Sequence, residues 1–199
     1  MVTKHKNTTV RQRQIVDAAG KTITEYGSEH VTVRRIAKEV GVSEGAIYRH
    51  FKSKKDILFL LAEHIEDTLL GDITKASAKG DTPLETLDNI LRNHLSATEQ
   101  RRGISFQIIA EIVSYGDKKL NRKIYDVIDK YVSHLKDILS QGVKAGEVRD
   151  DIDLDSAAIL LFGMIQGLVN IWALSNYSFN LEERYVPLWH VFREAIIRH

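Results

Sequence analysis

Residues 32–54, with the sequence TVRRIAKEVGVSEGAIYRHFKSK, have the pattern of two short helices joined by a tight turn. Three apolar residues give the first helix one buried face, and Gly41 supplies the left-handed residue that ends it. Ser43 then caps a second helix, which buries Ile47 and Phe51. On or near its outer side this second helix leaves Ser43, Glu44, Gly45, Ala46, Tyr48, Arg49 and His50. A short helix with this outer surface has the shape and chemistry to read the major groove of DNA.

The charges of the chain divide between this part and the rest. Residues 1–55 hold 12 Lys and Arg against 5 Asp and Glu, whereas residues 56–199 hold 16 against 22. A basic face attracts phosphates over a long range and an acidic face repels them, so we expect DNA to meet the N-terminal part only. Chance variation of surface charge along the chain is the alternative.

The composition favours an all-α protein. Of the 199 residues, 43% are apolar and 2 are Pro, and no long run of alternating β-branched residues indicates a strand. The absence of Cys excludes a disulfide framework, a zinc-thiolate site and a thiol redox sensor. The N-terminus has no apolar segment like that of a signal peptide, so we expect a soluble, cytoplasmic protein without a membrane segment.

Capping signals and apolar periodicity predict nine helices. A flexible basic tail, residues 1–8, precedes a first helix that begins at a capping box of Thr9 and Gln12 and ends at Gly27. The other helices are expected at 32–40, from 43, from 53 to about 73, from 82, and at about 103–115, 120–145, 153–174 and 181–197.

The first 60 residues resemble the DNA-binding domain of the tetracycline-repressor (TetR) family of transcriptional regulators. The residues that carry the resemblance are Thr32, Ile36, Ala37, Gly41, Val42, Ser43, Gly45, Tyr48, His50, Phe51 and Lys54. Thr22-Ile23 stands where the family often has Leu-Phe, which we interpret as a packing variant. The resemblance implies a nine-helix, two-domain architecture: a helix-turn-helix domain at 9–55, with its motif at 32–51, and a helical effector-binding and dimerisation domain at 56–199.

Three residues are expected to hold DNA phosphates. Lys54 lies in the first turn of the fourth helix, where the helix dipole disfavours a cation, and a phosphate bound at that helix start would explain it. By resemblance, Lys54, Tyr48 and His50 all contact phosphate. The hydroxyls of the caps Thr32 and Ser43 are expected to reach phosphate as well. The alternatives are a solvated Lys54 and a Tyr48 that packs locally.

Recognition of a DNA sequence requires side chains that reach the edges of the bases in the groove. By resemblance Arg34 occupies a position that reads a base, and its guanidinium suits a bidentate contact to guanine. Glu44 can accept a hydrogen bond from cytosine, and Arg49 can contact guanine or a phosphate. Gly45 and Ala46 give the clearance that lets the helix approach the groove.

A palindromic operator has two half-sites, and two copies of the groove-reading helix must lie about 34 to 36 Å apart to contact both. Operator binding therefore requires a dimer. Gly163 and Gly167, four residues apart in the eighth helix, clear one face for the close approach of another helix. The resemblance implies that the eighth and ninth helices pair with their copies, and we expect Leu188 and Phe192 at this interface. Alternatively, the two glycines only fit the helix into its own subunit.

The resemblance also implies a cavity for a small-molecule effector in the larger domain. We expect the cavity to be lined by Phe106, Ile109, Tyr125, Ile128, Phe162 and Gln166. Plain core packing of these residues is the alternative. Glu111 either lies on a solvent-exposed face of its helix or makes a polar contact with the ligand. No metal or cofactor is expected, because His64, His94 and His134 lie on different helices without metal-ligand spacing.

The sequence therefore predicts a homodimeric repressor that binds double-stranded operator DNA and is released by an effector of unknown identity. In the mechanism that the resemblance implies, the effector shifts the fourth helix. Two alternatives stay open: an effector-independent or architectural DNA-binding protein, and an enzyme that uses the helical cavity. The enzyme is disfavoured because the sequence has no paired carboxylates, Ser/His/Asp grouping or phosphate loop.

Overall fold

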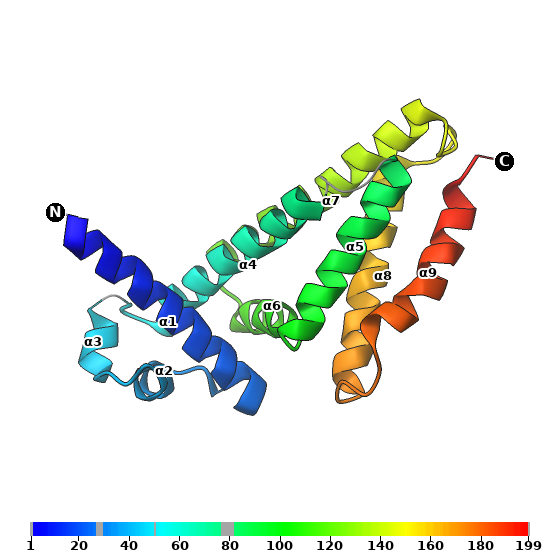
Figure 1. Cartoon of the computed structure of the whole chain (residues 1–199). Coiled ribbons are helices and arrows are strands. Elements are labelled where there is room, and N and C mark those ends of the chain that lie inside the picture. The colour runs from blue at the N-terminus through cyan, green and yellow to red at the C-terminus, as the bar shows by residue number, and fades with distance from the viewer. Residues whose placement is uncertain (1, 27–29, 50, 77–81, 199) are drawn as a thin grey trace. The chain divides into compact units, whose positions relative to one another are not determined.

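The computed structural model describes residues 2–26, 30–49, 51–76 and 82–198. These residues form nine helices and, apart from one isolated β-bridge between Val148 and Ile197, no strand (Figure 1). The helices are α1 (Val2–Tyr26), α2 (Val33–Val40), α3 (Glu44–Tyr48), α4 (Lys54–Ala76), α5 (Pro83–Gln100), α6 (Ile104–Tyr115), α7 (Lys118–Ala145), α8 (Leu154–Leu174) and α9 (Leu181–Ile196). The all-α prediction is confirmed, and most predicted helix bounds agree within two residues.

The chain folds into two compact units. The first contains Met1–Glu66 and Ile104–Ile124, and the second contains Asp67–Gly103 and Tyr125–His199. Helix α6 belongs to the first unit because it packs on α1, where a side-chain carbon at Gly20 would lie 2.9 Å from Ile104 Cδ1. This grouping differs from the boundary that we predict near residue 56, because α4 continues through that position and α6 joins the helix-turn-helix segment.

Local capping sets the helices of the first unit. Thr32 Oγ1 accepts a hydrogen bond from the Arg35 amide at 3.2 Å, and α2 ends at Gly41 with φ of 73°. Ser43 Oγ accepts from the Ala46 amide, also at 3.2 Å, and starts α3. The apolar faces that these caps align form a core of Ile15, Ala19, Val31, Ile36, Ala37, Ile47, Phe51, Ile57, Leu58 and Leu61. The two short helices are therefore fixed from beneath, while their outer surfaces stay in solvent.

The N-terminal segment differs from the prediction. Residues 2–8, expected as a flexible tail, are the first turns of α1. These residues contain neither Gly nor Pro, so nothing in them interrupts a helix before Thr9. The capping-box spacing of Thr9 and Gln12 therefore lies inside α1 rather than at its beginning.

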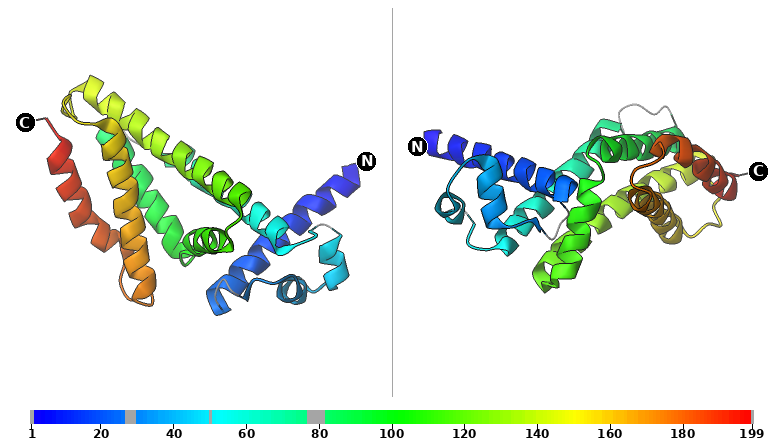
Figure 2. Two further views of the ribbon diagram at one scale, coloured as in Figure 1. Left: turned by 180° about the vertical axis from the view of Figure 1, so that it is seen from behind. Right: turned by 90° about the horizontal axis from the view of Figure 1, so that it is seen from below.

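The second unit is built from longer helices. Its α5 begins with the predicted capping box, in which Thr82 Oγ1 accepts from the Glu85 amide at 3.3 Å and Glu85 Oε2 accepts from the Thr82 amide at 3.2 Å. Helices α8 and α9 lie side by side, as both views of Figure 2 allow the reader to follow. The core includes Leu87, Leu91, Leu95, Tyr131, Leu135, Leu161, Ile165, Trp172, Leu181 and Tyr185.

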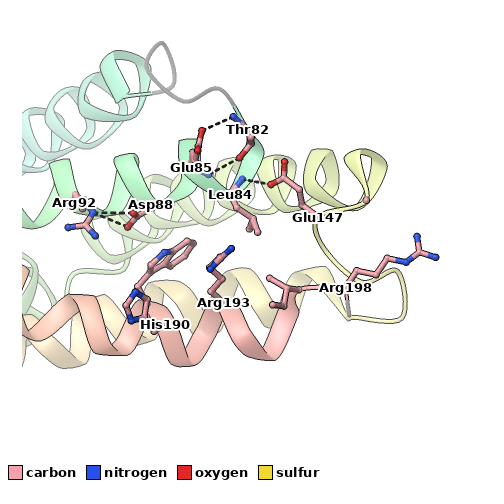
Figure 3. Close-up of a pocket in the computed structure, with 12 residues that line it drawn as sticks. Thr82, Leu84, Glu85, Asp88, Arg92, Glu147, His190, Arg193 and Arg198 are labelled. Carbon is pink, nitrogen blue, oxygen red and sulfur yellow. Dashed lines mark hydrogen bonds and ion pairs between the residues drawn. The ribbon is translucent and has the colours of Figure 1, made fainter.

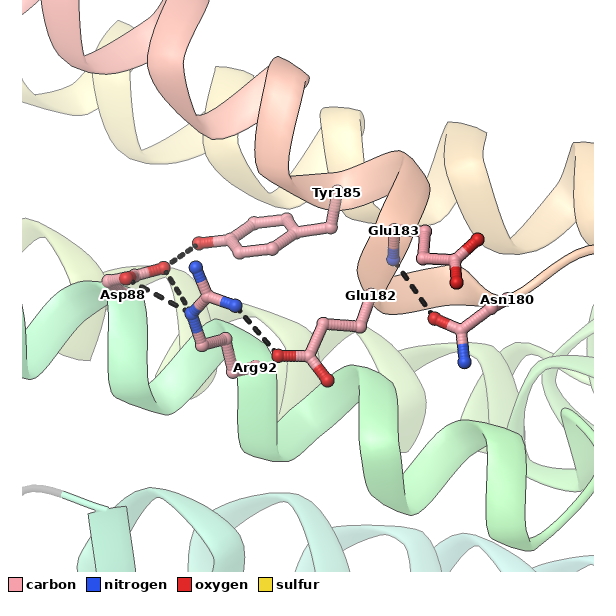
Figure 4. A network of polar contacts seen from close by, with 6 residues as sticks. All are labelled: Asp88, Arg92, Asn180, Glu182, Glu183 and Tyr185. Atoms are coloured by element: carbon pink, nitrogen blue, oxygen red, sulfur yellow. Dashed lines mark hydrogen bonds and ion pairs between the residues drawn. The ribbon is translucent and has the colours of Figure 1, made fainter.

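A polar network joins α5 and α9 inside the second unit (Figure 4). The hydroxyl of Tyr185, a fully buried residue, donates to Asp88 Oδ1 at 2.8 Å. Arg92 Nε donates to both oxygens of Asp88 at 3.1 Å, and Arg92 Nη1 donates to Glu182 at 2.7 Å. Burial raises the pKa of the Tyr185 phenol, and the Asp88 carboxylate raises it further. A neutral phenol and an ion pair thus attach the first half of α9 to α5.

Helix α8 is apolar on both its buried and its exposed sides. By length and composition alone it is long and apolar enough to cross a membrane, a test that the core helix of a soluble protein also passes. Seven of its residues are buried in the second unit. Several of its other apolar side chains are exposed, namely Ile159, Leu160, Ile171 and Leu174.

Candidate functional site

The outer surface of α2 and α3 carries the residues predicted to read bases. Arg34 and Glu44 have side chains that are 88% and 49% exposed, and Arg49 is exposed as well. Arg34 Nε lies 4.0 Å from Glu44 Oε1, so the structure brings these two predicted base readers to the same side of the motif. Tyr48, predicted to contact phosphate, is 48% exposed, which disfavours the alternative that its ring packs locally.

Small residues leave the outer side of α3 open. Within 4 Å, a side-chain carbon at Gly45 would meet only Ser43 Oγ, at 4.0 Å, so packing within the chain does not require glycine there. Ala46, the next residue, is half-buried. This geometry is compatible with the predicted clearance of both residues. His50, which we predict to contact phosphate, lies outside the described residues.

A basic hollow of about 230 Å³ adjoins the start of α2. It is lined by His30, Thr32, Arg34, Arg35 and Lys38. The Arg35 guanidinium carbon lies 3.9 Å from the centroid of the Tyr26 ring, a cation–π contact that holds this side chain at the rim. His30 and Lys38 are not among the predicted site residues, although the spacing of four residues between Arg34 and Lys38 is a helical signal that indicates the cluster.

Lys54, predicted to hold a phosphate, has a carboxylate partner in the structure. Its Nζ lies 2.6 Å from Glu111 Oε1 on α6, and the two side chains are 31% and 13% exposed. The next residue, Lys55, places its Nζ 2.5 Å from Asp117 Oδ2. Asp117 also accepts hydrogen bonds from the Lys119 and Leu120 amides at the start of α7. The hydrogen bond from Lys55 contributes most, and together these bonds hold the pKa of the Asp117 carboxyl below its usual range. Two carboxylates therefore compensate the cations that the dipole of α4 disfavours.

The six residues predicted to line an effector cavity are divided between the two units. Phe106 and Ile109 lie on α6 in the first unit, whereas Tyr125, Ile128, Phe162 and Gln166 lie on α7 and α8 in the second. Five of the six are half-buried, and Tyr125 is 56% exposed. The Phe162 ring contacts the buried ring of Tyr131, with 6.0 Å between centroids. The effector role of the six residues stays a prediction.

A polar cleft of about 600 Å³ lies in the second unit, where the start of α5 faces the second half of α9 (Figure 3). Its carboxylates are occupied: Glu85 and Glu147 accept from backbone amides of Thr82 and Leu84, and Asp88 holds Arg92. The side chains of His190 and Arg193 have no hydrogen bond or ion pair to any described residue. Arg198 is a further basic residue that lines the cleft, and no local sequence pattern predicts this grouping.

A second, apolar groove of about 400 Å³ follows the exposed sides of α8 and α9. It is lined by Arg149, Ile152, Asp153, Ser156, Ala157, Leu160, Met164, Leu188, Val191, Phe192, Ala195 and Ile196. Leu160 and Val191 are 60% and 73% exposed, an unusual state for aliphatic side chains that share one surface. The groove is therefore a candidate interface with a second copy.

The residues predicted for the dimer interface occupy different environments. A side-chain carbon at Gly163 or Gly167 would meet no described atom within 4 Å, so neither glycine is required by packing within its own subunit. Leu188 is 36% exposed and lines the groove. Phe192, by contrast, is 4% exposed and its ring stacks on Trp189, so it packs mainly in its own subunit and only forms the floor of the groove.

The fold and the motif together define a helix-turn-helix DNA-binding protein with a second, helical unit. Residues 15–61 match the model of the tetR family of bacterial regulatory proteins, and residues 62–195 match the model of the C-terminal region of YsiA-like proteins. The chain belongs to the tetR family, and it is a DNA-binding transcriptional regulator.

Two relatives in sequence and one solved structure are similar to the chain over most of its length. The fatty acid metabolism regulator protein of Bacillus subtilis (strain 168) is 29% identical over 168 residues, which cover 84% of this chain and 86% of that protein. The nucleoid occlusion factor SlmA of Actinobacillus pleuropneumoniae is 29% identical over 189 residues, covering 94% and 93%. The crystal structure of FadR from Bacillus subtilis in complex with stearoyl-CoA aligns with a TM-score of 0.76 and 28% identity, covering 92% and 95% of the two chains.

Proposed function

We propose that the protein is a homodimeric repressor that binds operator DNA through the outer surface of α2 and α3 and is released by a fatty acyl-CoA thioester. The observation that carries the proposal is the α2–α3 motif, whose caps and buried residues fix two helices while Arg34, Glu44 and Tyr48 stay exposed. The similarity to FadR, whose structure holds stearoyl-CoA, supports the class of effector. Such a regulator acts in the cytoplasm, where it meets its operator.

Residues of the segment from Thr32 to Lys54 divide into three roles on DNA. Tyr48, His50 and Lys54 contact phosphates, and the hydroxyls of Thr32 and Ser43 reach phosphates while they cap their helices. Arg34, Glu44 and Arg49 reach base edges in the major groove. Gly45 and Ala46 let the backbone of α3 approach the groove. The contact between Arg34 and Glu44 is exposed and long, so opening it on DNA costs less than about 1 kcal/mol.

Dimerisation places two such motifs on one palindromic operator. The exposed apolar side chains of α8 and α9 support a four-helix interface between two copies, with Gly163 and Gly167 at the closest approach of the two α8 helices. Leu188 lies in this interface, and Phe192 supports it from beneath. The interface fixes the separation of the two motifs, which must match half-sites about 34 to 36 Å apart.

Effector binding acts on this separation. Within the second unit, the half-buried apolar residues Ile128 and Phe162 suit the acyl chain of a thioester, with Tyr125 and Gln166 as polar partners. A thioester that binds the released form better than the DNA-bound form shifts the population toward the released form. A coupling of about 1 to 3 kcal/mol weakens DNA binding roughly 5- to 150-fold.

Stearoyl-CoA is therefore expected to lower the affinity of the protein for DNA by about 5- to 150-fold. It should also raise the thermal unfolding temperature of the protein. The operator for this experiment is selected from a random duplex library, and binding is measured by fluorescence anisotropy with and without the thioester. Coenzyme A without an acyl chain is the control and should leave the affinity unchanged. If acyl-CoA thioesters from lauroyl to stearoyl neither stabilise the protein nor release it, the effector class is wrong.

A second candidate function is an effector-independent DNA-binding protein of the nucleoid. The similarity to the nucleoid occlusion factor SlmA over 94% of this chain favours it. Such a protein would bind many chromosomal sites, and small molecules would not change its affinity for them. Genome-wide mapping of binding sites distinguishes the two functions, because we expect a ligand-controlled repressor to occupy a few promoters.

A further inference from the structure

The ion pair between Lys54 and Glu111 connects the start of α4, directly after the DNA-binding motif, to α6. The two atoms are 2.6 Å apart, and both residues lie in the first unit, Lys54 in the first turn of α4 and Glu111 in the middle of α6. The Glu111 side chain is only 13% exposed, and Lys54 is its one polar partner among the described residues. A carboxylate that is mostly buried and has a single cationic partner holds that partner more firmly than a surface carboxylate does.

The neighbouring pair of Lys55 and Asp117 differs in this respect. Asp117 also accepts hydrogen bonds from the amides of Lys119 and Leu120, so it caps α7 whether or not Lys55 is present. Among the described residues, Glu111 has no comparable hydrogen bonds from backbone amides. The Glu111 carboxylate therefore serves only the contact between α6 and the start of α4 among the described residues.

We propose that Glu111 competes with DNA phosphate for Lys54 and so lowers the affinity of the free protein for DNA. This inference rests on the proposed phosphate contact of Lys54. A phosphodiester and a carboxylate each carry one negative charge, so the ammonium group of Lys54 exchanges one anionic partner for another when DNA binds. While Glu111 remains paired, its own charge repels the approaching phosphate.

The competition gives α6 control over DNA binding. A position of α6 that holds Glu111 close to Lys54 favours the free protein, and a position that withdraws Glu111 favours the complex with DNA. Because coupling between two sites is reciprocal, a phosphate bound to Lys54 also releases Glu111 and loosens α6 from the start of α4. Lys54 is thus a shared residue of the DNA interface and of the contact with α6.

The substitution Glu111→Gln tests this inference. Fluorescence anisotropy on the selected operator, at one fixed salt concentration, should show about 3- to 30-fold tighter binding, because each of two subunits no longer breaks a partly exposed ion pair. Glu63→Gln is the control: Glu63 is an exposed residue of α4 in the same unit, and its replacement changes the net charge equally. The control should tighten binding much less. Weaker binding of Glu111→Gln would overturn the inference, because Glu111 would then orient Lys54 for phosphate.

A double-mutant comparison assigns the effect to Lys54. In a Lys54→Gln background, Glu111→Gln should tighten binding no more than Glu63→Gln does. An equal gain in both backgrounds would overturn the inference. If Lys54→Gln alone leaves the affinity unchanged, the phosphate contact of the proposed function is wrong. If Lys54→Gln weakens binding and Glu111→Gln still brings no gain, the competition alone is wrong.

The unmodified protein supplies a measurement that does not depend on the folding of a variant. The ammonium resonance of Lys54, assigned by NMR, should shift when operator DNA is added, because the partner of the ammonium group changes from a carboxylate to a phosphate. An ammonium resonance that is the same in the free and DNA-bound protein would contradict the exchange.

Discussion

Replacing two exposed residues of the α8–α9 groove by glutamate, Leu160→Glu together with Val191→Glu, is expected to convert the dimer into a monomer. The two side chains are 60% and 73% exposed in the single chain, so the substitutions cost the folded subunit little. In the dimer the same positions bring four carboxylates into an apolar interface without partners, which is strongly unfavourable. The monomer then holds one half-site instead of two, and we expect DNA binding to weaken about 100-fold or more.

Sedimentation velocity measures the mass of this variant, and anisotropy measures its affinity for the selected operator. Val113→Glu is the control for mass, because Val113 is 60% exposed but lies on α6 in the first unit. The control should sediment at twice the mass of the chain, as the unmodified protein should. A Leu160→Glu/Val191→Glu variant that remains a dimer would place the interface on another surface.

Asp88→Ala is expected to lower the free energy of unfolding of the second unit by about 2 to 3 kcal/mol. The substitution leaves the hydroxyl of Tyr185, which has no exposed surface, without its acceptor and removes the bidentate partner of Arg92. For a chain of this length the loss corresponds to a fall of about 5 to 10 °C in the unfolding temperature. Trp172 and Trp189, the two tryptophans of the chain, both lie in the second unit, so their fluorescence reports its unfolding.

Two further variants show whether the network causes this loss. Tyr185→Phe removes only the hydroxyl and should cost about 1 kcal/mol, and the double variant should cost less than the two single losses together. Asp129→Ala, at an exposed position of α7, should change the stability by less than about 0.5 kcal/mol. If Asp88→Ala is no more destabilising than Asp129→Ala, the network does not attach α9 to α5.

The helices and the DNA-binding motif could be predicted because their signals are local. The caps Thr32 and Ser43 bond to amides three residues further along, and Gly41 takes the left-handed conformation that ends α2. The capping box of Thr82 and Glu85 is equally local. A local pattern is informative only when competing signals are absent. Residues 2–8 are helical in the structure, which differs from the flexible tail expected there, because these residues contain no helix-breaking residue.

Contacts between distant segments could not be predicted. Nothing near Lys54 in the sequence indicates Glu111 as its partner, because the pair depends on the packing of α6 in the first unit. The same packing explains why Phe106 and Ile109 belong to a different unit from the other predicted effector residues. The network of Asp88 and Tyr185 likewise requires α5 and α9 to meet, which the periodicity of either helix alone does not determine.

We expect the segment from Thr32 to Lys54 to contact the DNA backbone in a dimer, and the salt dependence of operator binding tests this most directly. Each phosphate that a Lys or Arg neutralises contributes about −0.9 to the slope of the logarithm of the association constant against the logarithm of salt concentration, so Lys54 in two subunits predicts a slope of about −2, and each further cation of the segment that reaches a phosphate makes the slope steeper. A slope near zero would contradict the phosphate contacts and, with them, the assignment of this segment as the DNA-binding site.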